Sequence, residues 1–262
     1  MISILIVVPT LNSYHLLPRL VQTIEDQSFT NWRVLFIDGG SNQDHINWLR
    51  DQCEKDSRFH WEPEVDPGRG IFAAMNQGFV KGKQDDWVLF WGSDDMAADK
   101  DIFSRINATL MRMKEYPDLY ICSARYYSME KLLDTDSLEV NRVSRFILCG
   151  TLRHSLFWGS TPPHQATFFG PGARMLLERY DDRFLLTGDL DYYLRLSLLG
   201  EVRVLIDQSV LVLMGNSGVS ATQSRQKYKE VMRSYQRAFG WLWVIPFISR
   251  YIRRVTSVIG RQ

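Results

Sequence analysis

Short apolar segments that alternate with helical patterns constrain the fold of this chain more than any other feature. The apolar segments lie at 2–8, 33–37 and 88–91, and each ends at turn-forming residues. Between the first two, Leu16, Leu20 and Ile24 follow the spacing of a helix. Strands that are apolar on both faces and alternate with helices are typical of a parallel sheet covered on two sides. We therefore predict an α/β fold.

Polar residues follow each of these strands. Ligands of open α/β sheets bind beyond the carboxyl ends of the strands, so we expect the polar residues to line one cleft. Asp38 is placed to accept hydrogen bonds from a base or a ribose, although Asp followed by Gly is also a common turn pair. The residues expected at this edge are Thr10, Asn12, Asp38, Gly40, Asp94 and Asp95.

Two adjacent carboxylates, Asp94 and Asp95, appear shortly after the unbroken apolar run at 88–91. Neighbouring carboxylates repel each other unless a cation lies between them. Their oxygens suit Mg²⁺ or Mn²⁺, especially when the phosphates of a substrate complete the shell. The alternative is that Ser93, Asp94 and Asp95 open the next helix, because Ser and Asp are good N-caps. The local sequence leaves both possibilities open.

Composition and charge exclude several classes of protein. The chain has 262 residues and a net charge of +1, which allows one large or two small domains and gives no field that would attract nucleic acid. Three scattered cysteines form no disulfide framework, so we expect a reducing, cytoplasmic compartment. The first apolar run ends at Pro9, which predicts a strand and not a signal peptide. No apolar run is long enough to span a membrane.

A Pro- and Gly-rich loop at 62–70 precedes a helix that begins near Ile71. Arg69 stands just before that helix, where an anionic phosphate can be held. The alternative is that Arg69 pairs with Glu64 or Asp66.

Four motifs in the first 100 residues resemble those of the family 2 glycosyltransferases with a GT-A fold, in particular bacterial enzymes that build cell-surface polysaccharides. The motifs are Pro9-Thr10-Leu11-Asn12, Ile37-Asp38-Gly39-Gly40-Ser41, the segment 64–78 and Ser93-Asp94-Asp95. The resemblance implies a GT-A domain with a mostly parallel central sheet and flanking helices.

The resemblance also implies a nucleotide-diphosphate sugar as donor and Mn²⁺ or Mg²⁺ as cofactor. The family's first acidic metal position is Gly92 here, so the sequence does not choose between Asp94 and Asp95 as the metal ligand. The donor-binding residues implied are Pro9, Thr10, Asn12, Asp38, Gly40, Arg69, Gly70, Asn76, Ser93 and Asp94.

A predicted helix at 187–196 carries a second pair of acids. Asp189 and Asp191 are two residues apart and therefore point to nearly opposite sides. Asp191 has Arg195 four residues on, a spacing that predicts an ion pair, whereas Asp189 has Tyr193 there. The resemblance implies that Asp189 is the catalytic base; the alternative is that Asp189 only caps the helix.

Further segments of the second half match the family less fully. His164 and Gln165 lie in a segment that resembles the family's His-Gln-x-x-Phe, which implies a contact with the diphosphate or the acceptor. Asp191 is a third candidate for that contact, and a structural hydrogen bond is the alternative for His164. We expect irregular structure at 125–148, two strands at 202–206 and 210–213, and a family-like loop near the active site at 214–220.

The chain ends in an amphipathic, basic segment, so we divide it into a GT-A domain at 1–239 and a C-terminal helix at 240–262. The arginines on its polar side are Arg250, Arg253, Arg254 and Arg261. An apolar face backed by arginines is typical of a helix that lies in an anionic membrane interface. The alternative is that the stripe packs on the catalytic domain. The apolar stripe is Trp241, Ile245, Ile248, Ile252, Val255 and Ile259.

Together these features predict an inverting, metal-dependent glycosyltransferase. It would move a sugar to a hydroxyl of a glycan or a lipid-linked acceptor during cell-surface polysaccharide synthesis, in the cytoplasm or on the inner face of the cell membrane. One alternative is a sugar-phosphate nucleotidyltransferase, but that class needs a Gly-rich loop with Lys or Arg where this chain has Pro9–Asn12. A catalytically inactive binding module is disfavoured because both acidic motifs are retained.

Overall fold

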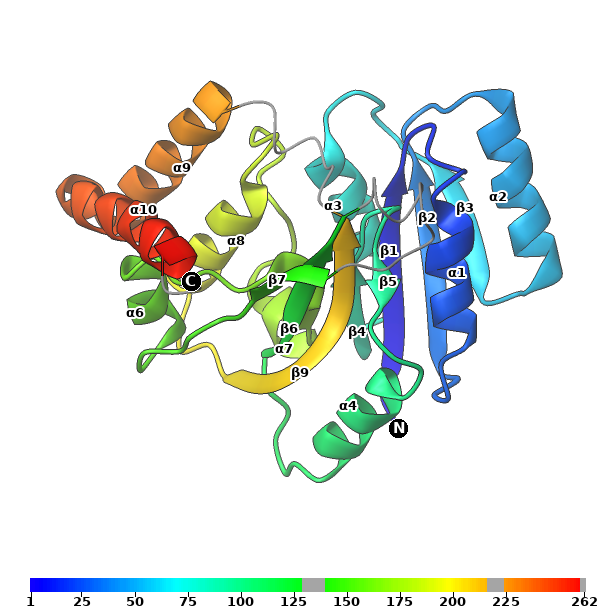
Figure 1. Ribbon diagram of the computed structural model, residues 1–262, viewed down its shortest axis with the longest axis horizontal. Helices are drawn as coiled ribbons and strands as arrows, with labels where there is room; N and C mark the ends of the chain where they lie inside the picture. The colour runs from blue at the N-terminus through cyan, green and yellow to red at the C-terminus, as the bar shows by residue number, and fades with distance from the viewer. Residues whose placement is uncertain (129–139, 216–223, 260–262) are drawn as a thin grey trace.

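The computed structural model describes residues 1–128, 140–215 and 224–259, which form one nine-stranded sheet flanked by helices (Figure 1). The strands are β1 (Ser3–Thr10), β2 (Trp32–Asp38), β3 (Phe59–Pro63), β4 (Asp86–Phe90), β5 (Met96–Ala97), β6 (Leu119–Tyr127), β7 (Val140–Ser144), β8 (Thr167–Phe169) and β9 (Val204–Gly215). The α-helices are α1 (Leu17–Glu25), α2 (Gln43–Lys55), α3 (Ile71–Lys81), α4 (Ile102–Met111), α6 (Leu152–Phe157), α7 (Pro171–Leu176), α8 (Gly188–Leu196), α9 (Ser224–Phe239) and α10 (Val244–Ile259). Short 3₁₀ turns are η1 (His164–Ala166) and η3 (Gly240–Trp243).

The sheet has a parallel half and a mixed half. Its order is β3-β2-β1-β4-β8-β6-β9-β5, with β7 beside β6. The four strands from β3 to β4 are parallel, so their carboxyl ends meet at one edge. Strand β8 runs antiparallel to both β4 and β6, while β6 and β9 are parallel. The α/β prediction is confirmed, but antiparallel pairs on β5, β7 and β8 make the sheet more mixed than expected.

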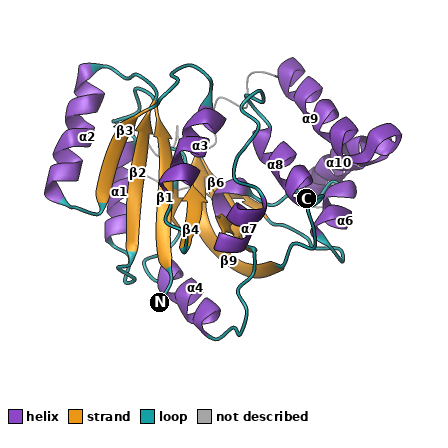
Figure 2. Ribbon diagram, turned by 180° about the vertical axis from the view of Figure 1, so that it is seen from behind, coloured by secondary structure: helices purple, strands orange, loops and turns teal. Residues whose placement is uncertain are grey.

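The alternation of side chains along β1 builds a core on each face of the sheet. Ile4 and Ile6 pack on the side of α1 and α4, and Leu5 and Val7 pack on the side of α3 and α8. Helices α1 and α4 lie on the face of the sheet seen in Figure 1. Helices α3 and α7 lie on the opposite face, seen in Figure 2. Runs of apolar residues, rather than alternating ones, are therefore needed in the central strands.

Close glycine contacts hold α3 against β1 and the start of α8 against the start of α3. A Cβ atom at Gly78 of α3 would lie 2.5 Å from Val7 of β1, so only glycine lets this helix approach the strand so closely. A Cβ atom at Gly188, the first residue of α8, would lie 2.8 Å from the ring of Phe72 in α3. The two helices therefore begin beside each other.

Two of the predicted elements differ in the structure. The segment at 125–148 is not irregular throughout, because β6 continues to Tyr127 and pairs with β7. The two strands expected at 202–206 and 210–213 are one strand, β9, with a register shift between them. The carboxylate of Asp207 accepts hydrogen bonds from the Tyr120 hydroxyl (2.6 Å) and from Ser209 N (2.8 Å). These bonds hold the polar residues inside the strand as a bulge.

The C-terminal helix α10 packs against α6 and α9 with one face and exposes the other (Figure 2). Phe247 contacts the core cluster beneath, and Arg250 is buried, with its guanidinium bonded to Thr161 Oγ1. The expectation that Arg250 belongs to a solvent-facing basic side is therefore wrong. Part of the predicted apolar stripe is exposed instead: Trp241 by 86%, Ile245 by 47%, Ile248 by 50% and Ile252 by 59%.

The rest of that stripe and of the arginine set carries no structural description. The side chains of Arg254, Val255 and Ile259 and all of Arg261 lie outside the described residues, as do 216–220 of the predicted loop at 214–220. Among the helices of the described ranges, none is both long enough and apolar enough to cross a membrane.

Candidate active site

The carboxyl ends of β1, β2, β3 and β4 form one edge of the sheet, and the turns that leave them carry the polar residues (Figure 1). Register aligns Thr10 with Asp38 and Asp38 with Pro63, so these strand ends lie side by side. Ser93 is linked to the β1 turn by a hydrogen bond between its Oγ and that of Ser13, 2.8 Å apart. The residues that the structure brings to this edge are Pro9, Thr10, Asn12, Asp38, Gly40, Ser93, Asp94 and Asp95.

Asp38 holds its own turn together. Its Oδ2 accepts hydrogen bonds from Gly40 N (3.1 Å) and Ser41 N (2.9 Å). Its Oδ1 accepts from Ser41 Oγ (2.5 Å) and Thr10 Oγ1 (3.3 Å). His45 is fully buried, with Nε2 3.3 Å from the same Oδ1. The turn predicted by Asp-Gly is therefore present, and the side chain of Asp38 is engaged within it.

Asn12 and Gly40 shape the surface of this edge. Asn12 has a φ of 50°, a left-handed conformation that Asn tolerates better than most residues. Its Oδ1 accepts a hydrogen bond from Asn42 N, and its N donates to Ser41 Oγ, both at 2.8 Å. Gly40 has a φ of +95°, which favours glycine. Asn12 thus ties the turn after β1 to the turn after β2.

Asp94 and Asp95 lie in a turn that leads from β4 into β5. Helix α4 begins only at Ile102, so the alternative that these residues open a helix is wrong. Asp95 is only 2% exposed, and its Oδ2 accepts a hydrogen bond from Gly92 N (2.6 Å). Asp94 is half-buried, and both acids line a cavity of about 100 Å³. The two acids therefore differ in exposure: Asp95 is almost fully buried and its Oδ2 is bonded within the turn, whereas Asp94 is half-buried.

Two residues far along the chain fix the position of Asp94. The hydroxyl of Tyr127, at the end of β6, donates to Asp94 O at 2.6 Å. Gly215, at the end of β9, lies against the carboxylate so closely that a Cβ atom there would be 2.1 Å from Asp94 Oδ2. Analysis of the sequence missed Tyr127 entirely, and it found Gly215 only as part of a loop motif.

The electrostatics of the pair fit a bound cation. Burial, and then the charge of Asp94, raise the pKa of Asp95 well above its usual range, and burial also raises the pKa of Asp94. A cation beside these groups would favour their ionised forms. The described residues contain no cluster of three or more His, Cys, Asp or Glu side chains that could hold a metal. This donor set suits Mg²⁺ or Mn²⁺ that takes further ligands from phosphate and water.

The start of α3 is held by contacts across the edge. Arg69 pairs with Asp66 (3.3 Å), as one alternative anticipated, and with Asp182 (2.8 Å) in the segment before α8. Gly70 has a φ of +90° and precedes the helix. The amide of Asn76 accepts from Tyr180 N (2.7 Å) and donates to Tyr180 O (3.1 Å). Asn76 therefore joins α3 to the segment before α8, and its side chain is occupied by backbone.

Helix α8 separates its two acids as their spacing predicts. Asp191 is 1% exposed, and its carboxylate accepts from Arg195 Nε (2.7 Å) and a guanidinium nitrogen of Arg237 (3.1 Å). The predicted ion pair is confirmed, and these contacts bury the carboxylate of Asp191 between two arginines. Asp189 lies in the first turn but does not cap the helix, because Thr187 holds the N-cap position.

Glu230 of α9 holds the segment that leads into α8. Its carboxylate accepts hydrogen bonds from the backbone N atoms of Leu185 (3.1 Å), Leu186 (2.9 Å) and Thr187 (2.9 Å). The side chain is almost fully buried. This contact fixes where Asp189 stands, and sequence analysis missed it. The available signal was that Glu230 is the last acidic residue of a basic C-terminal region.

His164 and Gln165 link the surroundings of Asp189 to the strand that precedes Asp94. The ring of His164 stacks on Phe90 of β4, and its Nε2 lies 2.9 Å from the Tyr180 hydroxyl. Burial lowers the pKa of His164 to about 4, against a smaller opposite effect of Asp189. Trp91, next along from Phe90, donates from Nε1 to Gln165 O (2.9 Å). His164 is therefore a neutral, hydrogen-bonded imidazole near Asp189.

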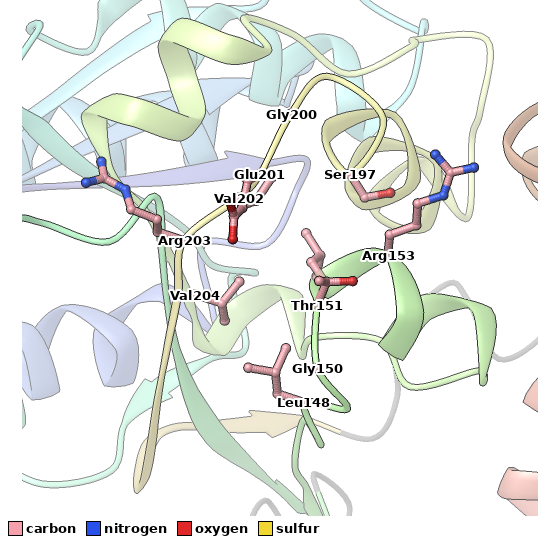
Figure 3. A pocket seen from close by; sticks show the side chains of 11 residues that line it. Leu148, Gly150, Thr151, Arg153, Ser197, Gly200, Glu201, Val202, Arg203 and Val204 are labelled. Carbon is pink, nitrogen blue, oxygen red and sulfur yellow. The ribbon is translucent and has the colours of Figure 1, made fainter.

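A cavity of about 630 Å³ lies at the other end of the β6–β9 pair, near Val204 (Figure 3). Register places Val204 beside Leu119 at the start of this pair and Gly215 beside Tyr127 at its end, near Asp94. The guanidinium groups of Arg153 and Arg203 point outward on opposite sides of the cavity (Figure 3). This cavity is therefore separate from the acidic edge.

Comparisons with known proteins agree with this arrangement. A family model described as glycosyl transferase family 2 matches residues 5–180. An uncharacterised glycosyltransferase of Mycobacterium tuberculosis is 28% identical over 187 residues, which cover 71% of this chain and 65% of that protein. A PGL/p-HBAD biosynthesis glycosyltransferase of Mycobacterium bovis is 24% identical over 196 residues, covering 72% and 68%. The chain spans about two thirds of the length of these relatives.

Solved structures share the fold at low sequence identity. TarS of S. aureus in complex with UDP-GlcNAc superposes with a TM-score of 0.66 at 14% identity, covering 91% of this chain and 68% of that one. A mannosyltransferase from Pyrobaculum calidifontis, in complex with GDP-Man and Mn²⁺, gives a TM-score of 0.63 at 12% identity, covering 95% and 69%. These likenesses confirm the predicted GT-A fold.

Proposed function

Since the chain belongs to glycosyl transferase family 2, we propose that it transfers a sugar from a nucleotide-diphosphate sugar to a hydroxyl group of an acceptor. The transfer inverts the configuration at the anomeric carbon and depends on Mn²⁺ or Mg²⁺. The observation that carries the proposal is the position of Asp94, half-buried beside a cavity at the strand edge, with Asp189 in the first turn of α8, whose first residue packs on Phe72 at the start of α3.

The donor lies, in this proposal, across the turns after β1, β2 and β4. Asp94 would hold the cation, because it is the more exposed of the two acids and Oδ2 of Asp95 already accepts the bond from Gly92 N. Asp95 then acts by holding the turn. When bound at Asp94, a divalent cation would supply the positive charge that offsets the negative charge on the departing nucleoside diphosphate. Arg69, exposed just before α3, would add a second positive charge at this edge by exchanging its pairs with Asp66 and Asp182 for the diphosphate.

Asp189 takes the proton from the acceptor hydroxyl as that oxygen attacks the anomeric carbon. Among the described residues it forms no ion pair, in contrast to Asp191, so its carboxylate is free to act as a base. Glu230 and Asn76 support it indirectly, since they hold the segment before α8. No covalent intermediate is needed, and the site offers no Ser or Cys nucleophile motif.

The test is release of nucleoside diphosphate from a panel of nucleotide sugars, with Mn²⁺, with Mg²⁺ and with excess EDTA. UDP-GlcNAc and GDP-Man come first, because solved neighbours bind them. We expect one donor to be turned over with metal and not with EDTA, and Asp94→Asn to remove most of that activity. Release of pyrophosphate from a nucleoside triphosphate and a sugar phosphate would instead support a nucleotidyltransferase.

We further propose that α10 rests on an anionic membrane surface, in cell-surface polysaccharide synthesis with a lipid-linked or glycan acceptor on the cytoplasmic side. The exposed residues Trp241, Ile245, Ile248 and Ile252 supply the apolar contact. The opposite face is anchored to the catalytic domain through Arg250 and Phe247. A helix held in this way keeps a fixed distance between the membrane and the acidic edge.

Flotation with liposomes that contain anionic lipid tests this surface. Exchange of Ile248 and Ile252 for Ser should reduce flotation strongly, whereas the same exchange at exposed Val80 on α3 should not. Equal flotation of both variants and the wild type, or flotation of none, would contradict the membrane role.

A further inference from the structure

Asp38 has little capacity left for a ligand. An ionised carboxylate offers about four lone-pair positions. Four hydrogen bonds reach the Asp38 oxygens, from Gly40 N, Ser41 N, Ser41 Oγ and Thr10 Oγ1. A nucleobase that bonded to Asp38 would have to displace one of these four hydrogen bonds. Sequence analysis placed Asp38 to bond a nucleobase or a ribose. Its carboxylate is instead occupied by hydrogen bonds within its own turn.

Glu64 stands next to Asp38 at the same edge. It follows β3 directly, and its N donates to Asp38 O at 2.8 Å. Its Oε2 lies 3.4 Å from the position that a Cβ atom would take at Gly39. The carboxyl group is thus turned back toward the turn after β2 rather than out into solvent.

Glu64 is a buried acid that forms no ion pair with any residue in the described part of the chain. The residue is 9% exposed, and its Oε1 is buried with no hydrogen-bond partner among the described residues. Burial, and then the charges of Asp66 and Asp38, raise the pKa of Glu64. A buried polar atom without a partner is costly and calls for an explanation. Glu62, two residues earlier on β3, is ordinary by contrast: it pairs with Lys81 at 2.8 Å.

We propose that Glu64 reads the nucleobase of the donor, and selects bases that present a ring N–H, namely uracil or guanine. This assignment rests on the proposed function, because it requires a nucleotide donor at this edge. With the diphosphate near Asp94 at the end of β4, the nucleoside extends across β1 toward the ends of β2 and β3. The terminal torsion of a Glu side chain is soft, so Oε1 turns toward the base at low cost. A ring N–H then supplies the missing donor, whereas cytosine and adenine present a ring acceptor in its place.

Binding of free nucleoside diphosphates tests the proposal without turnover. Calorimetric Kd values are measured for UDP, GDP, CDP and ADP with saturating Mn²⁺, for the wild type, Glu64→Gln and Glu64→Asp. The matched control is Glu62→Gln, on the same strand. We expect the wild type to prefer UDP or GDP, and both Glu64 variants to weaken that nucleotide about 10–100-fold, the usual worth of a hydrogen bond to a charged group. The control should bind as the wild type does.

Inorganic pyrophosphate with Mn²⁺ separates the base contact from the rest of the site. Its Kd should be equal in all four proteins, and thermal melting verifies that each is folded. Unchanged Kd values for UDP and GDP in both Glu64 variants, or a wild-type preference for CDP or ADP, would overturn the proposal and leave the glycosyltransferase intact. If the wild type binds no nucleoside diphosphate more tightly than pyrophosphate, the proposed function fails as well.

Discussion

Gly215→Ala tests directly whether Asp94 is the metal ligand. Gly215 ends β9, and its φ lies outside the left-handed region, so alanine suits the backbone there. The added Cβ atom would lie 2.1 Å from Asp94 Oδ2 and 2.9 Å from Asp94 Cγ, whereas ordinary contact begins at 3.4 Å. The carboxylate must therefore move by 3.4 − 2.1 = 1.3 Å. The main chain of Asp94 stays in place, because Tyr127 holds its carbonyl.

The cost of this movement falls on metal binding rather than on folding. Turning one side chain away from its preferred rotamer costs about 0.5–1.5 kcal/mol. Metal–ligand distances, in contrast, tolerate only about 0.2 Å. We expect the Kd for Mn²⁺ in the presence of nucleoside diphosphate to rise about 10–100-fold, as it does when groups supporting a metal ligand are changed. Free Mn²⁺ is measured by electron paramagnetic resonance during titration, and stability by urea unfolding.

Two comparisons make the result decisive. Gly200→Ala is the matched control, because nothing lies within 4 Å of its added Cβ atom and its φ also permits alanine. In an Asp94→Ala background, Gly215→Ala should have no further effect on Mn²⁺ affinity, since the group that it displaces is gone. A folded Gly215→Ala protein that binds Mn²⁺ as tightly as the wild type would refute the role given to Asp94.

Other predictions concern the surroundings of α8. Asp189→Asn should lower kcat by about 10²–10⁴-fold with donor KM nearly unchanged, which steady-state kinetics checks. Asp191→Asn should lower the free energy of unfolding by about 1–3 kcal/mol, by weakening the contacts with Arg195 and Arg237, and leave kcat nearly intact; the opposite pattern would exchange the roles of the two acids. Because the pKa of His164 is about 4 in the folded protein, the unfolded chain takes up a proton first, so stability falls as the pH drops from about 6.5 to 4. That shift in pKa is worth about 3 kcal/mol of unfolding free energy. Urea unfolding at several pH values should show that the stability of His164→Gln depends less on pH than that of the wild type. Parallel pH profiles of the two proteins would contradict the buried, neutral state given to His164.

Local patterns were sufficient for the elements and for the polar edge. Apolar runs identified β1, β2 and β4, and helical spacing identified α1, α3 and α8, because burial on one or both faces is written into short stretches of sequence. Parallel crossovers then brought the strand ends together, and with them the turns that contain Thr10, Asp38 and Asp94. The spacing of Asp191 and Arg195 was equally local, and that ion pair is present.

Local patterns failed where a polar segment is held by a distant partner. The bulge at Asp207 depends on Tyr120, which lies on another strand, so β9 read as two strands. The close approach of α10 at Arg250 depends on Gly159, where a Cβ atom would lie 2.5 Å from the Arg250 backbone. Helical spacing alone placed this arginine on the polar side of the segment, without saying which side faces the domain.

The sequence by itself determined which residues stand at the edge of the sheet, since their positions follow from strand ends. Only the tertiary structure decided what each of them is free to do. Asp38 is engaged by its own turn, Asp95 is almost fully buried and Asp94 is half-buried, although all three stand at the carboxyl ends of parallel strands. The physical reason is that the availability of a carboxylate depends on which donors and which close contacts surround it. For Asp94 these come from Tyr127 and Gly215, residues that meet it only when β6 and β9 pair.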